Sequence, residues 1–301
     1  MAVRFECTIL GVNSAYPVHG RHPSCQVINY NNELIMIDCG ESAQIHLSNL
    51  SIKRSRINHI LISHLHGDHC FGLPGLLTSF SLQGRSKKLT IHGPLNIKKY
   101  LETVLEISGS YLTYELDILE YDTSICHDFS IHKNLEVQTF PLDHRMPTMG
   151  FRLQEKQSEM NIDPSKIKEY DLSIEEIKAV KRGEDIRGLS NSKFVLPMTK
   201  NRSYAYCSDT AYDESIINYI KEVDLLYHEA TYLGELEQLA IERKHTTLAQ
   251  AIQIAKLSSA GKLLVGHYSS RYTDLSEFVK RGKEKLGDKF LLGQEGETYA
   301  I

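Results

Sequence analysis

Hydrophobic and polar positions along this chain follow two periods, one typical of strands and one typical of helices. Strand patterns occur at Phe5 to Leu10, Cys25 to Tyr30 and Leu34 to Asp38, with turn-rich loops between them. The largely apolar run from Ile57 to Ile62 predicts a buried strand. Helical patterns alternate with strands in both halves. This alternation favours an α/β protein, an αββα sandwich in which two mixed sheets carry helices on their outer faces.

Two helices have boundaries that single residues predict. Pro94 stands at the start of an amphipathic pattern, which predicts a helix with proline in its first turn. Thr247 and Gln250 have the spacing of a capping box, ahead of a helix over 248–258. Gly261 follows that pattern and predicts the end of the helix.

The segment from Gln154 to Leu189 has weak apolar periodicity and is rich in lysine and glutamate. Its cations could form a positive arm that follows a phosphate backbone: Lys156, Lys166, Lys168, Lys178, Lys181, Arg182 and Arg187. Acidic residues lie between them, so a solvated helical excursion of mixed charge explains the composition equally well. We expect a single domain over 1–301, with an inserted arm over 155–190 that protrudes from it.

The overall composition limits the classes of function. A formal charge of −4 and a pI near 6.4 give no global sign of nucleic-acid affinity, so RNA binding would need a local basic patch. Six cysteines without a C-x-x-C pair argue against a disulfide framework and against a thiolate zinc site. No apolar stretch approaches the ~20 residues that span a bilayer, and no apolar leader is visible. We therefore expect a cytoplasmic protein that does not enter membranes.

The densest group of candidate metal ligands follows the buried strand over 57–62. His64, His66, Asp68 and His69 occur within six residues. Neutral imidazole binds zinc and other first-row metals, and a carboxylate can bridge two ions or take a proton from water. A chance cluster of loop histidines is the alternative, but a position at the end of a strand favours a rigid hydrolytic site. The cluster is too small for two metals, so we expect further ligands downstream.

Polar residues end several other strands in the same way: His144, Asp209, Glu229 and His267 each follow an apolar run. Asp209 could give one oxygen to each of two ions, although an N-cap role for the next helix is the alternative. Asp38 also ends a strand, and either supports a metal ligand or caps a helix. Because sites form where the strands of an α/β sheet end, these side chains are expected to converge.

Longer motifs extend this pattern. HLHGDH is followed by CFGLPGLL and later by DH, SDT, HEAT and GHYSSRY. In this order the motifs cover nearly the whole chain, and the sequence resembles the ribonuclease Z family, tRNA 3′-processing endonucleases with the metallo-β-lactamase fold. The resemblance implies removal of the 3′ trailer from precursor tRNA, with a 3′ hydroxyl left on the tRNA and a 5′ phosphate on the trailer. It also implies a homodimer in which the arm of one subunit holds tRNA bound at the other's site.

The resemblance further implies two Zn²⁺ per subunit, with Mn²⁺ or another divalent metal as the alternative. Three residues would hold each ion and one would bridge the pair: His64, His66 and His144; Asp68, His69 and His267; and Asp209. Asp68 would also be the general base toward the attacking water. His245, oriented by Glu229, would be the acid for the departing oxygen. Arg271 would contact the phosphate.

Two positions depart from the family pattern, and other functions fit part of the evidence. The arm reads Tyr170 to Glu176 without the Gly-Pro tip of the family, which leaves its grip on tRNA open. Ser208 stands where a glycine precedes the bridging aspartate. One alternative is a hydrolase of the same fold that acts on small phosphodiesters or another ester. A non-catalytic nucleic-acid-binding or scaffold protein is the other, which the complete ligand set disfavours.

Overall fold

The strands of the protein form two sheets of seven in a computed structural model that describes residues 3–156, 160–196 and 200–301. The first sheet contains β1 (Phe5–Gly11), β2 (Cys25–Tyr30), β3 (Glu33–Ile37), β4 (Ile57–Leu61), β5 (Leu89–Pro94), β6 (Leu116–Tyr121) and β14 (Thr298–Ala300). Their order is β14-β1-β2-β3-β4-β5-β6. From β3 to β6 the strands are parallel, so their carboxyl ends lie at one edge.

The second sheet is built from β7 (His127–His132), β8 (Leu135–Leu142), β9 (Thr148–Glu155), β10 (Ser203–Cys207), β11 (Leu225–Glu229), β12 (Lys262–Gly266) and β13 (Phe290–Leu292). Their order is β13-β12-β11-β10-β9-β8-β7. β9 is antiparallel to both neighbours, and β10 to β13 are parallel. It follows that β8, β10, β11 and β12 end at the same edge.

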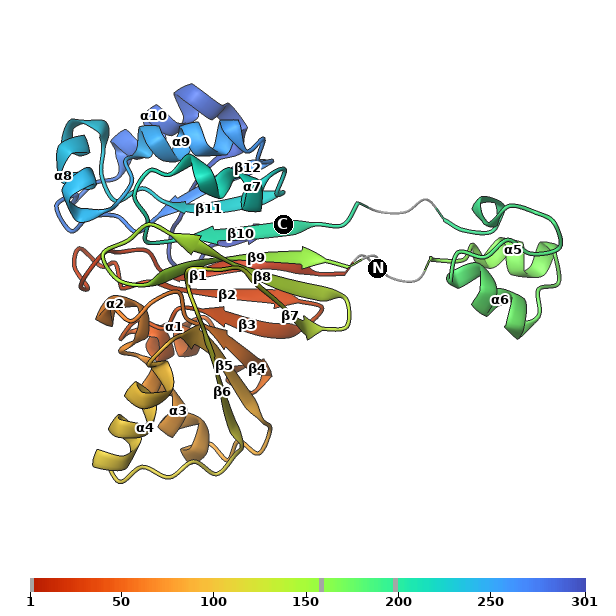
Figure 1. Cartoon of the computed structure of the whole chain (residues 1–301), viewed down its shortest axis with the longest axis horizontal. Helices are drawn as coiled ribbons and strands as arrows, with labels where there is room; N and C mark the ends of the chain where they lie inside the picture. The colour runs from red at the N-terminus through yellow and green to blue at the C-terminus, as the bar shows by residue number, and fades with distance from the viewer. Residues whose placement is uncertain (1–2, 157–159, 197–199) are drawn as a thin grey trace.

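Helices cover the outer face of each sheet, which confirms the expected αββα sandwich of the metallo-β-lactamase type (Figure 1). On one side lie α1 (Ala43–Asn49), α2 (Gly67–Cys70), α3 (Leu73–Leu82) and α4 (Ile97–Ile107). On the other lie α7 (Ile217–Ile220), α8 (Glu237–Arg243), α9 (Leu248–Leu257) and α10 (Ser276–Leu286). Within the described ranges, no helix combines the length and apolar character needed to cross a membrane.

The inner faces of the two sheets bury a common core. Phe5 and Ile9 of β1, Phe140 of β8 and Phe151 of β9 are at most 2% exposed and belong to one cluster. Alternation along β1 places these side chains inward, as the period-two pattern predicts. Each such side chain contributes about 1.5–3 kcal/mol when it is fully buried. This packing holds the two sheets face to face.

One predicted helix start is wrong, whereas the helix predicted over 248–258 is observed over Leu248–Leu257. Pro94 is the last residue of β5, and α4 begins three residues later, because Asn96 first adopts a left-handed conformation. The capping box of Thr247 is present, but α9 ends before Gly261. A Cβ on Gly261 would lie 2.6 Å from the carbonyl oxygen of Asp224, so glycine is needed there for close chain packing.

Two further helices, α5 (Pro164–Glu169) and α6 (Ile174–Lys181), lie between β9 and β10 in sequence and far from the sandwich (Figure 1). They share a small apolar cluster of their own: Leu172, Val180, Ile186 and Phe194. These residues lie on different elements, so no helical period connects them. This is why the apolar periodicity of the segment is weak. Residues 157–159 of the expected insertion over 155–190 are outside the described residues.

Candidate metal centre

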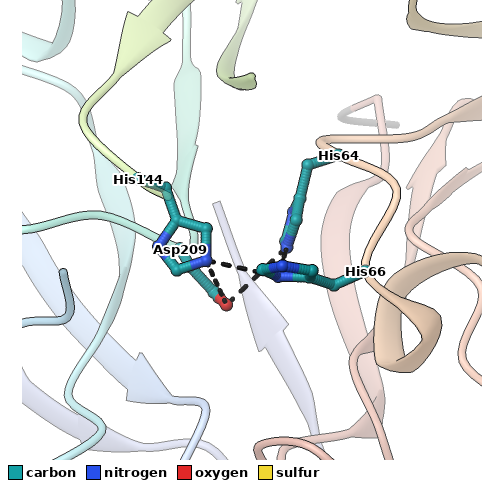
Figure 2. A group of neighbouring side chains, drawn as sticks. All are labelled: His64, His66, His144 and Asp209. Carbon is teal, nitrogen blue, oxygen red and sulfur yellow. Dashed lines mark hydrogen bonds and ion pairs between the residues drawn. The ribbon is translucent and has the colours of Figure 1, made fainter. Parts of the chain in front are cut away.

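Four predicted ligands converge at the shared edge of the sheets (Figure 2). His64 and His66 follow β4, His144 follows β8 and Asp209 follows β10. Nδ1 of His66 lies 3.0 Å from Nε2 of His64 and 3.3 Å from Nε2 of His144. Both Nε2 atoms are 3.8 Å from Oδ2 of Asp209. Three imidazoles and one carboxylate oxygen therefore surround one point.

A second group lies beside the first: Asp68 and His69 of α2, with His267 after β12. Oδ2 of Asp68 is 3.6 Å from Nε2 of His69 and 3.6 Å from Nε2 of His267. The other oxygen of Asp209, Oδ1, is 3.5 Å from His69 and 3.2 Å from His267. The carboxylate of Asp209 thus directs one oxygen to each group.

These spacings match the needs of a divalent cation. Ligand bonds of 2.0–2.2 Å in tetrahedral geometry place ligand atoms about 3.3 Å apart. The nitrogen and oxygen donors are those that zinc and neighbouring metals accept. Ser208, the departure from the family pattern, donates its hydroxyl hydrogen to Oδ1 of Asp209 at 2.7 Å. The serine therefore orients the shared carboxylate.

Hydrogen bonds on the far side of the rings fix the ligands. Asp38 accepts from Nδ1 of His69 at 2.7 Å, and it also accepts from Ser63 and Tyr206. Of the two roles expected for Asp38, these contacts show support of a ligand and not the capping of a helix. Nδ1 of His144 lies 2.9 Å from the carbonyl oxygen of Lys244. Such partners set the tautomer and the orientation of metal-binding imidazoles.

Glu229 and His245 form a buried pair next to both groups. Nδ1 of His245 is 2.8 Å from Oε1 of Glu229, which is fully buried at the end of β11. Burial alone would lower the pKa of His245, but the negative charge of Glu229 and the hydrogen bond raise it to about 9. Backbone N–H groups of Thr210 and Thr246 also donate to Glu229. Both oxygens of Glu229 thus accept hydrogen bonds, and Oε1 is the one that orients His245.

An open cleft of about 420 Å³ gives access to these residues. Asp68, Asp209 and His245 line it, and so does Arg145, which sequence reasoning missed although it directly follows a predicted ligand. Arg271, expected to contact phosphate, is exposed and does not belong to the residues that line this cleft. Among the described residues, Arg145 is therefore the one arginine or lysine at the cleft wall.

The sandwich and the paired histidine–aspartate groups define a metal-dependent hydrolase of the metallo-β-lactamase fold. Ribonuclease Z of Parabacteroides distasonis is 39% identical over 302 residues, which cover 99% of each chain. Ribonuclease Z of Cytophaga hutchinsonii is 40% identical and covers 99% of this chain and 96% of its own. The chain belongs to the ribonuclease Z family.

Further comparisons agree on the fold. The short form of human tRNase Z is 25% identical, covers 98% of this chain and 99% of its own, and has a TM-score of 0.72. A family model described as Anti-Pycsar protein Apyc1 matches residues 5–177. That range includes the ligands up to His144 and excludes Asp209 and His267.

Proposed function

We propose that this protein is a tRNA 3′-processing endoribonuclease, which cleaves precursor tRNA to leave a 3′ hydroxyl on the tRNA and a 5′ phosphate on the trailer. The observation that carries the proposal is the pair of ligand groups that share Asp209 at an open cleft. Near-complete coverage by relatives named ribonuclease Z supports the same substrate.

The donor set supports two Zn²⁺ per chain, with Mn²⁺ as the alternative. His64, His66 and His144 would hold one ion, while Asp68, His69 and His267 would hold the other, and Asp209 would bridge them. Bound in this way, a pair of divalent cations supplies a strong nucleophile at neutral pH and neutralises phosphate charge.

The remaining steps belong to residues of the chain. Asp68 would take a proton from the attacking water, because its carboxylate lines the cleft and is held at Oδ2 by the backbone N–H of Ala15 at 2.8 Å. As the new oxygen–phosphorus bond forms, the bond from phosphorus to the tRNA 3′ oxygen breaks. His245, kept protonated by Glu229, would give its proton to that departing oxygen. Arg145 is placed to contact the phosphate.

A precursor tRNA with a 3′ trailer tests the proposal. Incubated with the metal-loaded protein, it should be cut once at the boundary of trailer and tRNA, and end mapping should give the two termini stated above. Intact precursor in the presence of Zn²⁺ or Mn²⁺ would overturn the assignment.

A second candidate is a hydrolase of the same fold for small phosphodiesters, because the same donor groups at an open cleft would serve any phosphate ester that enters it. The two candidates differ in their preferred substrate. If kcat/KM for bis(p-nitrophenyl) phosphate is substantial while precursor tRNA is ignored, the small-substrate function replaces the first.

The family resemblance also supports a homodimer, an arm over 155–190 that binds tRNA, and a cytoplasmic location. An arm held far from its own cleft is suited to substrate bound on a second subunit (Figure 1). Light scattering on purified protein would measure the subunit number, and cell fractionation would test the location.

A further inference from the structure

A third group of metal-ligand side chains lies apart from the catalytic centre. His22 comes from the loop before β2, His46 from α1, and Glu295 from the turn between β13 and β14. Their donor atoms all lie within 4.8 Å of one another. Nδ1 of His22 is 2.8 Å from Oε2 of Glu295, and Nε2 of His46 is 3.7 Å from the same oxygen. In the described chain, none of the three contacts a ligand of the catalytic centre through a hydrogen bond or an ion pair.

The three residues are held by well-anchored parts of the fold. Oε1 of Glu295 accepts from the backbone N–H of His22 at 2.5 Å, and the next residue, Gly296, donates to the carbonyl of Ile9 in β1 at 2.9 Å. The carbonyl of His22 accepts from Asn13 at 2.8 Å. The side chains of His46 and Glu295 are 15% and 13% exposed, and that of His22 is 30% exposed. The group is therefore preorganised, with its open side at His22.

Hydrogen bonds among the three residues do not account for the ring nitrogen Nε2 of His46. Its Nε2 is buried and has no hydrogen-bond partner among the described residues. The His22 and His46 rings lie 4.3 Å apart between centroids and direct nitrogen atoms to one carboxylate. A buried polar atom without a partner is unfavourable, and a bound cation would satisfy it.

We propose that Nδ1 of His22, Nε2 of His46 and the carboxylate of Glu295 form an auxiliary site for a first-row divalent cation, above all Zn²⁺. Two imidazoles and one carboxylate are a combination that zinc accepts, with solvent as the fourth ligand. Without the ion, His22 and Glu295 form a hydrogen bond. To admit the ion, the carboxylate would turn slightly, so that its oxygen lies about 3.3 Å from each ligand nitrogen.

The consequence of this site is local order next to the catalytic centre. The ion ties the loop over 12–24 to α1 and to the turn between β13 and β14. In the same loop, the backbone N–H of Ala15 donates to Asp68. The auxiliary ion therefore stabilises this loop, while the hydrogen bond from Ala15 to Asp68 is present without the ion, and the ion takes no part in the reaction.

Zinc counting on the full-length protein tests the proposal. After metal removal, Zn²⁺ is added, excess is dialysed away, and bound metal is measured by mass spectrometry. We expect one equivalent fewer in His46→Gln and in Glu295→Gln than in the wild type. His127→Gln, which alters a histidine on β7 far from either group in sequence, should keep the wild-type content.

Two further measurements separate this site from the catalytic one. His46→Gln and Glu295→Gln should hydrolyse bis(p-nitrophenyl) phosphate within about twofold of the wild-type rate at saturating metal. Zn²⁺ should raise the thermal midpoint of unfolding less in His46→Gln than in His127→Gln. Equal zinc content in all four proteins would overturn the site. Loss of the equivalent together with all hydrolysis would also overturn it, because the missing ion would then be catalytic. Either result leaves the precursor-tRNA assay unaffected.

Discussion

At the scale of single residues, Glu229 connects the proposed general acid with a proposed metal ligand. Its oxygens accept hydrogen bonds from His245, from the hydroxyl of Thr231 and from backbone N–H groups. Thr231 in turn lies 2.9 Å from Nδ1 of His267. One buried carboxylate thus orients both the proposed acid and, through Thr231, a metal ligand.

Replacing His245 tests the acid directly. His245→Ala should lower kcat on precursor tRNA by about 10²–10⁴-fold, the usual effect of losing a general acid, while zinc content stays constant. Single-turnover cleavage and metal analysis measure the two quantities. If zinc is lost instead, His245 belongs among the ligands. His127→Ala serves as the matched control.

Replacing Glu229 tests its role as a positioning residue. The charge of Glu229 raises the pKa of His245, so Glu229→Gln should lower that pKa. An acid must be protonated to act, and the fall of kcat at alkaline pH should therefore move to lower pH in this variant. If kcat of Glu229→Gln falls at the same alkaline pH as kcat of the wild type, Glu229 does not set the pKa of His245.

The sequence predicted the proposed ligands that the structure brings together and the support from Asp38, but not the supports of His144 and His267. Each proposed ligand lies at or shortly after the end of an apolar strand, so hydrophobic pattern and residue type together indicate it. The supports of His144 and His267 are the carbonyl of Lys244 and the hydroxyl of Thr231. A backbone carbonyl has no sequence signature, and threonine is too common to attract notice.

At the scale of elements, the strands were predictable, whereas the internal packing of the arm was not. β2 was predicted at its observed bounds, because its apolar residues are interrupted by polar ones in the manner of a strand and turn-rich loops flank it. The arm buries a few residues from separate turns and helices, and its remaining stability comes from local bonds such as the capping box of Ser173 and Glu176. Contacts of that kind leave no repeat in the sequence.

Two arm lysines are free to bind RNA. Lys168 and Lys178 are exposed and form no ion pair among the described residues, whereas Lys166 and Arg187 are paired with Glu169 and Glu176. Changing both lysines to alanine should weaken binding of precursor tRNA and reduce the slope of log affinity against log salt by about one per lysine.

The matched control replaces two unpaired lysines of the sandwich, Lys99 and Lys262, with alanine. Fluorescence anisotropy across a salt series measures both variants. Equal losses of affinity would show that the arm has no specific part in binding, and unchanged hydrolysis of a small diester would show that the cleft is intact.

At the scale of the whole molecule, the distance between arm and cleft predicts cooperation between subunits. A chain with Asp68→Ala keeps its arm but lacks the proposed base. A chain without residues 160–190 keeps its cleft. If the arm of one subunit serves the cleft of another, mixing equal amounts of the two inactive chains should restore up to about a quarter of wild-type cleavage, because about half of the dimers are mixed and each of these has one intact arm–cleft pair out of two.

The measurement is precursor-tRNA cleavage as a function of the mixing ratio, with a maximum near equal amounts. Mixing the arm-deleted chain with a doubly altered chain, Asp68→Ala without its arm, is the control and should restore nothing. An arm-deleted chain that cleaves precursor tRNA normally by itself would contradict the arrangement.

The ligands of each proposed ion come from both sheets. His64, His66, Asp68 and His69 follow a strand of the first sheet, and His144, Asp209 and His267 follow strands of the second. Each ion would then act as a crosslink between layers that are otherwise joined by apolar packing and by buried hydrogen bonds such as that from Tyr206 to Asp38, adding about 4 kcal/mol to stability at a thousandfold excess over its dissociation constant. Chelation should lower the melting temperature, and on heating the zinc should leave before the strands melt, because the sheets need to slide by only about one ligand spacing to release it.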